Sequence, residues 1–189
     1  MGKDFSDEDL MLSYQAGDAA AFETLYQRHR AGLYRYILRQ CKHESIAEEL
    51  YQDVWMNLIK ARERYEVNAK FTTWLYQMAH NRVIDHYRRQ QNMAGQNQAD
   101  AELDADETPA RTQDQPEQRA ALAAQTDRLL GLIDALPEEQ KQAFLLREEA
   151  GMSINEIAET CGVKPETAKS RLRYALNKLR EGLNEYEPG

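Results

Sequence analysis

Apolar residues recur with the period of an α-helix over most of this 189-residue chain. Between 44 and 62, an apolar residue stands at every fourth position from Ile46 to Leu58, and a broader apolar face runs through 19–40. Runs of β-branched residues, which are typical of strands, are scarce. We therefore predict an all-α protein.

The helices are predicted to form two small units. The first covers 5–92 and begins with a capping-box pattern at Ser6. It includes a loop at about 64–70, followed by a further helix. The second unit covers 119–186. Between the units, 93–118 is rich in Gln, Ala and Asp and has almost no large apolar residue, so we expect a flexible linker there.

The second unit has the local signals of a helix-turn-helix. Pro137 opens one helix and Gly151 ends it, because proline suits a first helical turn and glycine suits a helix end. Ser153 and Glu156 form a capping box for a short helix, which Gly162 closes, and a longer helix follows to about 183. The residues expected to fill the angle between these two helices, or to form the buried stripe of the longer one, are Ile157, Ala158, Val163, Ala168, Leu172, Ala175, Leu176 and Leu179.

Charge is distributed unevenly along the chain. The formal net charge is −8, which by itself argues against DNA binding. Seven acidic residues and one basic residue fall within 93–118, so most of the negative charge belongs to the predicted linker. In contrast, 164–180 holds six basic residues and one acidic residue. Because DNA meets the local field first, this segment is favourable for DNA binding.

A second segment, 71–89, combines aromatic and basic residues on one predicted helix. Aromatic rings can stack on unpaired bases, and cations can neutralise phosphates, so such a helix could hold a separated DNA strand. Ordinary core packing is the alternative. It is accepted for Leu75 and Met78 and is favoured for Trp74, but the basic residues are interleaved too closely for it to explain the whole set.

The longer helix of the helix-turn-helix has an outward polar face. At 100° per residue, Glu166, Ser170 and Arg173 point away from its apolar stripe, while Lys169 and Tyr174 flank that face. Arg171 and Lys178 lie at the border, where they suit phosphates better than base edges. A solvated surface is the alternative, but we favour DNA reading because the cations are one-sided and follow a helix-turn-helix.

An acidic face is predicted on the helix at 44–62, carried by Glu48, Glu49, Gln52 and Asp53. It could be a solvated surface or a docking site for a basic partner helix, and the residues alone leave both readings open. Similarly, the acidic linker could be a spacer or a strand that occupies a cationic channel.

Several functional classes are disfavoured. We find no catalytic set, no phosphate-binding glycine loop and no metal-ligand spacing, so we expect no enzyme activity, cofactor, metal or small-molecule substrate. The separation of Cys41 and Cys161 predicts two free thiols. No apolar stretch approaches the roughly 20 residues of a membrane span, and the acidic N-terminus is not expected to be a secretory signal. A conventional helix-turn-helix regulator and an enzyme with a helical regulatory domain remain the alternatives.

Four segments together resemble bacterial extracytoplasmic-function sigma factors of the sigma-70 family. They are IAEELYQDVWMNLIKA (46–61), FTTWLYQMAHNRVIDHYRR (71–89), LPEEQKQAFLLREEAGMSINEIAETCGV (136–163) and TAKSRLRYALNKLR (167–180). The resemblance covers nearly the whole chain. It implies a cytoplasmic promoter-specificity subunit of RNA polymerase, controlled by an anti-sigma factor that can hold it at the inner membrane.

The resemblance also assigns roles to particular residues. The first unit would be a sigma-2 domain that melts the −10 element, and the acidic face would dock on the β′ clamp helices of core polymerase. Residues expected at the −10 DNA are Tyr65, Asn68, Lys70, Phe71, Trp74, Asn81, Arg82, Asp85, His86, Arg88 and Arg89.

The second unit would be a sigma-4 domain that reads the −35 element and touches the β flap. Residues expected at the −35 DNA are Glu166, Thr167, Lys169, Ser170, Arg171, Arg173, Tyr174 and Lys178. The linker would thread toward the RNA exit path. Glu166 departs from the small polar residue or glycine that is common near this helix start, and it could accept a hydrogen bond from a cytosine amino group.

Overall fold

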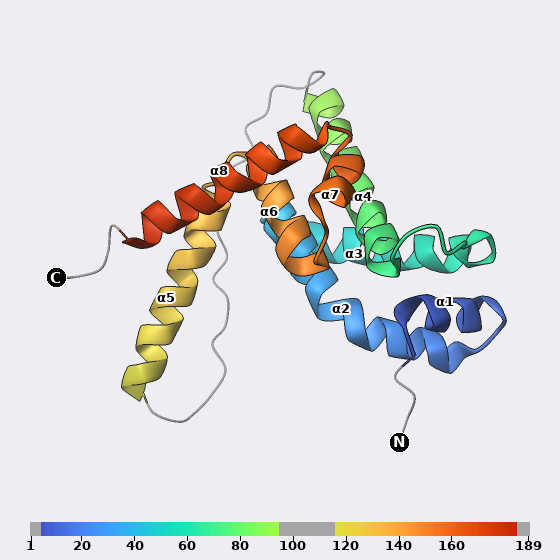
Figure 1. Ribbon diagram of the computed structural model, residues 1–189. Helices are drawn as coiled ribbons and strands as arrows, with labels where there is room; N and C mark the ends of the chain where they lie inside the picture. Colours follow the sequence, from blue (N-terminus) through green and yellow to red (C-terminus); the bar gives the residue numbers. More distant parts are fainter. Residues whose placement is uncertain (1–4, 95–115, 185–189) are drawn as a thin grey trace.

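A computed structural model describes residues 5–94 and 116–184 of the chain, and over those residues all regular structure is helical (Figure 1). This confirms the all-α fold. The central part of the predicted linker, 95–115, lies outside the described residues.

The first group of helices comprises α1 (Asp7–Gln15), α2 (Ala19–Cys41), α3 (Glu44–Ala61), the short 3-10 helix η1 (Arg62–Arg64) and α4 (Phe71–Ala94). Ser6 caps α1 by accepting a hydrogen bond from the Asp9 backbone N–H at 3.1 Å. Side chains on the predicted apolar faces of these helices form the core. They are fully buried or nearly so: Leu25, Leu33, Ile37, Leu50, Val54, Leu58 and Leu75.

The second group comprises α5 (Pro116–Asp134), α6 (Glu138–Ala150), α7 (Ile154–Cys161) and α8 (Pro165–Asn184). The expected caps are confirmed. Ser153 and Glu156 form a capping box, and Gly151 and Gly162 end their helices with φ of 63° and 65°. Ile157, Ala168 and Ala175 are buried, so α7 and α8 pack as the predicted helix-turn-helix.

One expected member of the α8 stripe is wrong. Leu176 is 41% exposed, whereas its neighbours Ala175 and Leu179 are buried. Helices α5, α6 and α7 all pack against α8, and the buried Ala175 and Leu179 lie on its packed side. Leu176 is turned by about 100° from Ala175, which carries it past the edge of that contact.

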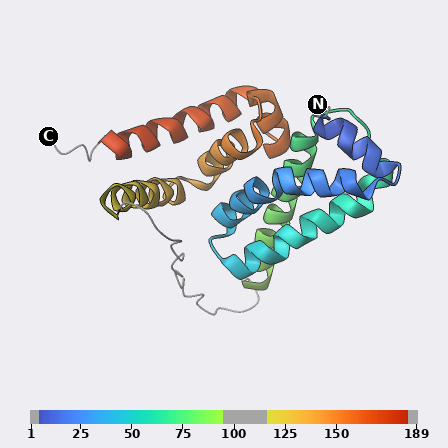
Figure 2. The ribbon, with the colours of Figure 1, turned by 90° about the horizontal axis from the view of Figure 1, so that it is seen from below.

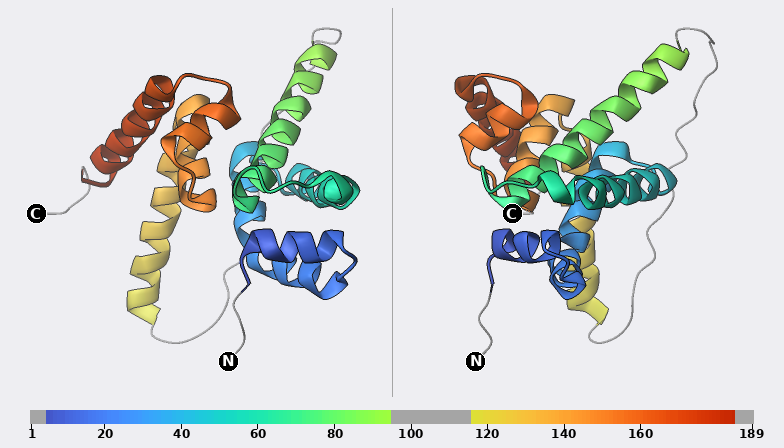
Figure 3. Two further views of the ribbon diagram at one scale, coloured as in Figure 1. Left: turned by 45° about the vertical axis from the view of Figure 1, so that its right-hand side comes forward. Right: turned by 90° about the vertical axis from the view of Figure 1, so that its right-hand side faces the viewer.

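The two groups of helices lie against each other, with α6 packed on α2 and both α6 and α7 packed on α4 (Figures 2 and 3). Arg35 of α2 makes two hydrogen bonds to the Glu149 carboxylate of α6, at 3.0 and 2.9 Å. Thr73 of α4 donates to the Glu156 carboxylate of α7 at 2.8 Å. Gly32 of α2 lies beside this contact: an added Cβ would stand 3.5 Å from a Glu149 carboxylate oxygen of α6 and, within the first group, 2.9 Å from the Tyr76 hydroxyl oxygen of α4.

Candidate nucleic-acid and partner interfaces

The outward face of α8 is open to solvent. Glu166, Thr167, Lys169, Arg173, Tyr174 and Lys178 are exposed, while Ser170 and Arg171 are half-buried. The Arg173 guanidinium lies 5.2 Å from the centre of the Tyr174 ring, an arrangement in which cation and ring present one continuous surface.

The cations of this face are not neutralised by neighbouring carboxylates. Among the described residues, no ion pair involves Lys169, Arg173 or Lys178. Because the buried stripe on the opposite side fixes α8 against α6 and α7, these side chains are held on a rigid helix whose charge is available to an external anion.

The start of α4 has a different character. Phe71 is fully buried, and Tyr65 in the preceding loop is 4% exposed. The Phe71 backbone N–H donates to the Glu8 carboxylate at 2.7 Å, which ties the helix start to α1. The Trp74 ring packs on Tyr65 at 4.9 Å between centroids. Burial, with a contribution from Glu8, raises the pKa of Tyr65 to about 12, so its hydroxyl remains neutral.

The loop before α4 therefore presents its polar side chains rather than its rings. Asn68 and Lys70 are exposed. The Asn68 amide donates to the Glu66 carboxylate at 3.1 Å. In this conformation the rings of Tyr65 and Phe71 stack within the protein, and neither is accessible to a DNA base.

The remaining residues expected at the −10 DNA lie in the second half of α4 and differ in their exposure to solvent. Asn81, Arg88 and Arg89 are exposed, and Asp85 and His86 are half-buried. Arg82 forms an ion pair with Asp53 of α3. This pair joins a residue expected at DNA to a residue expected at the polymerase surface, so the two surfaces share one electrostatic contact.

A cavity of about 700 Å³ lies between α4 and the helix-turn-helix. Asn81, Asp85 and Arg88 line it from α4, and Arg171 lines it from α8. The candidate −10 and −35 surfaces therefore approach each other in this arrangement.

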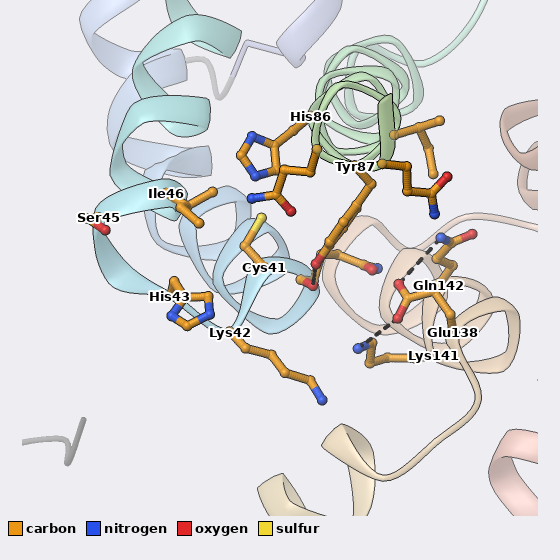
Figure 4. Close-up of a pocket in the computed structure, with 14 residues that line it drawn as sticks. Cys41, Lys42, His43, Ser45, Ile46, His86, Tyr87, Glu138, Lys141 and Gln142 are labelled. Carbon is orange, nitrogen blue, oxygen red and sulfur yellow. Dashed lines mark hydrogen bonds and ion pairs between the residues drawn. The ribbon is translucent and has the colours of Figure 1, made fainter. Parts of the chain in front are cut away.

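A neighbouring cavity of about 720 Å³ lies between the end of α2, the start of α3, the second half of α4 and the start of α6 (Figure 4). The Tyr87 hydroxyl donates to the Gln40 carbonyl oxygen at 2.5 Å. Lys141, which is almost fully buried, pairs with Glu138 at 3.0 Å. His86 lines this cavity, so it lies apart from the surface formed by Asn81, Asp85 and Arg88.

Both cysteines are free thiols, as expected. Cys41 is buried at the wall of this second cavity. Burial raises the pKa of its thiol to about 11, and Glu138 contributes in the same direction. Burial also raises the pKa of Cys161. Neither thiol is therefore activated as a nucleophile at neutral pH.

The acidic face of α3 is exposed at Glu48, Glu49 and Gln52 and half-buried at Asp53. A third cavity, of about 690 Å³, opens beside it and is lined by Tyr26, Tyr34 and Tyr51 together with Arg30, Ala31, Glu48 and Gln52. The sequence did not indicate this cavity, because Tyr26 and Tyr34 fall within the predicted helix at 19–40 and Tyr51 within the predicted helix at 44–62, and only packing of the two helices brings the rings together.

Neither a metal-binding cluster nor a membrane-crossing helix is found among the described residues. They include no group of three or more His, Cys, Asp or Glu side chains arranged to hold a metal ion. None of their helices combines the length and the apolar character that a membrane crossing requires.

Residues 25–93 match the family Sigma-70 region 2, and residues 126–179 match Sigma-70, region 4. The chain is 30% identical over 184 residues to the ECF RNA polymerase sigma factor SigK of Mycobacterium tuberculosis, covering 95% of each chain. It is 28% identical over 177 residues to the RNA polymerase sigma factor CarQ of Myxococcus xanthus, covering 94% of this chain and 97% of CarQ.

Solved structures share the fold. The sigma factor RpoE of Bartonella quintana, in complex with the anti-sigma factor NepR, aligns with a TM-score of 0.70 and 20% identity, covering 88% of this chain and 98% of RpoE. CnrH, in complex with the cytosolic domain of CnrY, aligns with a TM-score of 0.65 and 20% identity, covering 96% of this chain and 99% of CnrH.

Proposed function

Because the chain belongs to the extracytoplasmic-function (ECF) group of sigma-70 family RNA polymerase sigma factors, we propose that α3, α4 and α8 divide the work of promoter recognition. Sigma factors direct transcription initiation and are not enzymes. The family also separates this chain from the conventional helix-turn-helix regulators that share one of its motifs.

In this proposal α8 reads the −35 element as a duplex. The observation that carries it is the set of exposed cations Lys169, Arg173 and Lys178 on the second helix of a helix-turn-helix, none of which has an ion pair among the described residues. Thr167 and Ser170, near the helix N-terminus, are suited to base edges, while Arg171 and Lys178 are suited to phosphates. Glu166 would favour cytosine at one position of the element.

The −10 element is assigned to α4 and the loop before it. Asn68 and Lys70 provide exposed polar groups at the helix start, and Arg88 and Arg89 provide exposed cations toward its other end. Stacking on Trp74, which is half-buried, would offset part of the few kcal/mol per step that strand separation costs. Tyr65 and Phe71 would take part only after the loop rearranges.

Core polymerase is assigned to the acidic face of α3, where three of the four expected side chains are exposed. A basic helix of the polymerase would complement Glu48 and Glu49. Asp53 is less suitable as a test of this contact, because replacing it also breaks the ion pair with Arg82. Glu49 has no such partner among the described residues, so it is the cleaner position.

An anti-sigma factor is proposed as the regulatory partner. The solved RpoE structure of similar fold contains the anti-sigma factor NepR, and CnrH was solved with the cytosolic domain of CnrY. Control of this kind would retain the chain in the cytoplasm, or at the inner membrane, until the partner releases it to polymerase.

Co-elution with core RNA polymerase, followed by run-off transcription on promoter fragments, tests the proposal. We expect co-elution and transcripts that begin downstream of a shared −35 and −10 pair. Glu49→Lys should reduce co-elution, and Arg173→Ala should reduce transcription without affecting co-elution. Tight binding to duplex DNA without any binding to core polymerase would instead support a conventional regulator.

A further inference from the structure

Three tyrosines from two helices surround the cavity on the outer side of α2 and α3. Tyr26 and Tyr34 belong to α2 and Tyr51 belongs to α3, and all three are half-buried. The rings of Tyr34 and Tyr51 are perpendicular, with centroids 5.7 Å apart. The Tyr51 ring continues to Trp55 at 6.2 Å, so the aromatic wall is anchored in the core of the first helical group.

One wall of the cavity also carries a negative charge. Glu48 and Gln52 line it from α3. Burial raises the pKa of Tyr34, and the carboxylates of Glu44 and Glu48 contribute in the same direction. Burial raises the pKa of Tyr51 well above its usual value. The phenols of Tyr34 and Tyr51 therefore stay neutral at physiological pH and offer ring faces beside the Glu48 carboxylate.

This combination favours a cationic side chain as occupant. Aromatic faces attract ammonium and guanidinium groups, and a carboxylate at the rim adds a charge-assisted hydrogen bond. An apolar occupant would cover Glu48 without providing a donor, which costs free energy. An anionic occupant would be repelled by the carboxylate of Glu48, which lines the cavity.

We propose that this cavity, the tyrosine pocket (Tyr26, Arg30, Ala31, Tyr34, Glu48, Tyr51 and Gln52), receives an arginine or lysine side chain from the basic polymerase helix that docks on α3. The inference rests on the proposed binding of core polymerase to the acidic face, with which the pocket shares Glu48 and Gln52. It adds α2 to that interface and names the side-chain chemistry that the partner must bring.

Arg30 gives the proposal a distinctive consequence. It is an exposed cation that lines the pocket, and no ion pair holds it among the described residues. It therefore repels the incoming cation and can itself lie against the tyrosine rings. Removal of this charge should tighten binding, whereas a residue with a purely structural role would give no gain.

The experiment measures the affinity of the full chain for core RNA polymerase at low and high salt. Tyr34→Leu should bind roughly fivefold to thirtyfold more weakly, because the ring is lost. Tyr34→Phe, the matched control, should bind nearly as the unchanged chain does. Arg30→Gln should bind roughly twofold to fivefold more tightly at low salt, with a smaller gain at high salt.

The variant Glu49→Lys separates the two levels of the proposal, because Glu49 lies on the acidic face but outside the pocket. If Glu49→Lys weakens binding while Tyr34→Leu and Arg30→Gln do not change it, the pocket inference is wrong and the acidic face stands. If Glu49→Lys has no effect, the proposed docking face itself fails.

Two controls complete the test. Thermal unfolding shows whether Tyr34→Leu remains folded, and Arg30→Gln remains informative if it does not, because Arg30 is exposed. Sedimentation of the free chain tests another occupant. If Arg30→Gln makes the chain dimerise, the pocket binds a side chain of a second copy, which would overturn the assignment to polymerase.

Discussion

Helices α4 and α8 both combine aromatic and basic residues, and both are proposed to contact DNA, but they present these residues in opposite ways. On α8, Lys169, Arg173 and Tyr174 are exposed on a helix fixed from behind. On α4, Phe71 is buried in the core and Arg82 is paired with Asp53. One surface is complete in the free chain, and the other is partly occupied by the protein itself.

The difference corresponds to what each surface is proposed to bind. Duplex DNA already exists as a rigid partner, so a preformed row of side chains can read it. An unpaired base exists only after melting, and an exposed aromatic ring would otherwise face water or aggregate. A ring that leaves the protein core when a base becomes available avoids both problems, although this movement adds to the cost of melting.

The largest expected effect is the difference in the free energy of unfolding between a variant of Phe71 on α4 and a variant of Tyr174 on α8. Phe71→Ala should lower the free energy of unfolding by about 3–5 kcal/mol, because Phe71 is fully buried. Tyr174→Ala should change it by less than about 0.5 kcal/mol, because Tyr174 is 50% exposed. Tryptophan fluorescence during urea unfolding is a suitable measurement, since Trp55 and Trp74 both belong to the first helical group.

Equal effects at the two positions would break the comparison. A stable Phe71→Ala chain would indicate that the ring is not packed in solution, and the start of α4 would then be as open as α8.

A smaller effect is expected when the exposed cations of α8 are removed. Lys169→Ala and Arg173→Ala should each weaken binding to −35 duplex DNA by about 1–3 kcal/mol if they contact bases, with little change in stability. Titrations at several salt concentrations would distinguish base contacts, which alter sequence preference, from phosphate contacts, which alter the salt slope. Unchanged −35-dependent transcription by both variants would contradict the orientation assigned to α8.

The contact between the two helical groups allows a third test. Glu149→Ala removes both hydrogen bonds from Arg35, and it should weaken the docking of α6 on α2 by about 1 kcal/mol. Small-angle X-ray scattering should record a larger radius of gyration for this variant than for the unchanged chain. Glu148→Ala is the matched control, because Glu148 is exposed and has no ion pair among the described residues. An identical radius for both variants would show that this ion pair does not hold the groups together.

The smallest effect concerns pH. His80 is 6% exposed, and burial lowers its pKa below the ordinary value of 6.5, with Glu138 opposing that shift. Its ring nitrogen lies 3.2 Å from the Tyr36 hydroxyl oxygen. The unfolded chain therefore binds a proton more readily, so the stability linked to His80 is present above pH 6.5 and is lost as pH falls through the folded pKa. His80→Gln should flatten this part of the stability profile, and an unchanged profile would exclude His80 as its source.

The sequence predicts the local features of both helical groups well. The capping box at Ser153, the glycine ends at Gly151 and Gly162, and the buried stripe of α8 except Leu176 all follow from neighbours within a few residues. These features depend on helix geometry alone, which a periodic pattern encodes directly.

The features that the sequence could not predict depend on other helices. A helical period identifies an apolar face but not the element that covers it, so the bond from the Phe71 backbone to Glu8 of α1 and the pairing of Arg82 with Asp53 were not foreseen. The tyrosine pocket is a similar case, because its rings come from residues that are far apart in the chain. The roles assigned to the candidate DNA and polymerase residues stay predictions.

Gly32 restricts which side chains α2 can accept at this position. A methyl group at this position of α2 would stand 2.9 Å from the Tyr76 hydroxyl oxygen and 3.5 Å from a Glu149 carboxylate oxygen. Glycine is otherwise a poor choice within a helix, where alanine is more favourable by about 1 kcal/mol. Variation at position 32 is therefore constrained first by Tyr76 of α4, which belongs to the same helical group, whereas Glu149 of the second group makes only an ordinary van der Waals contact. A larger side chain at position 32 can be accommodated only together with a compensating change or shift at Tyr76.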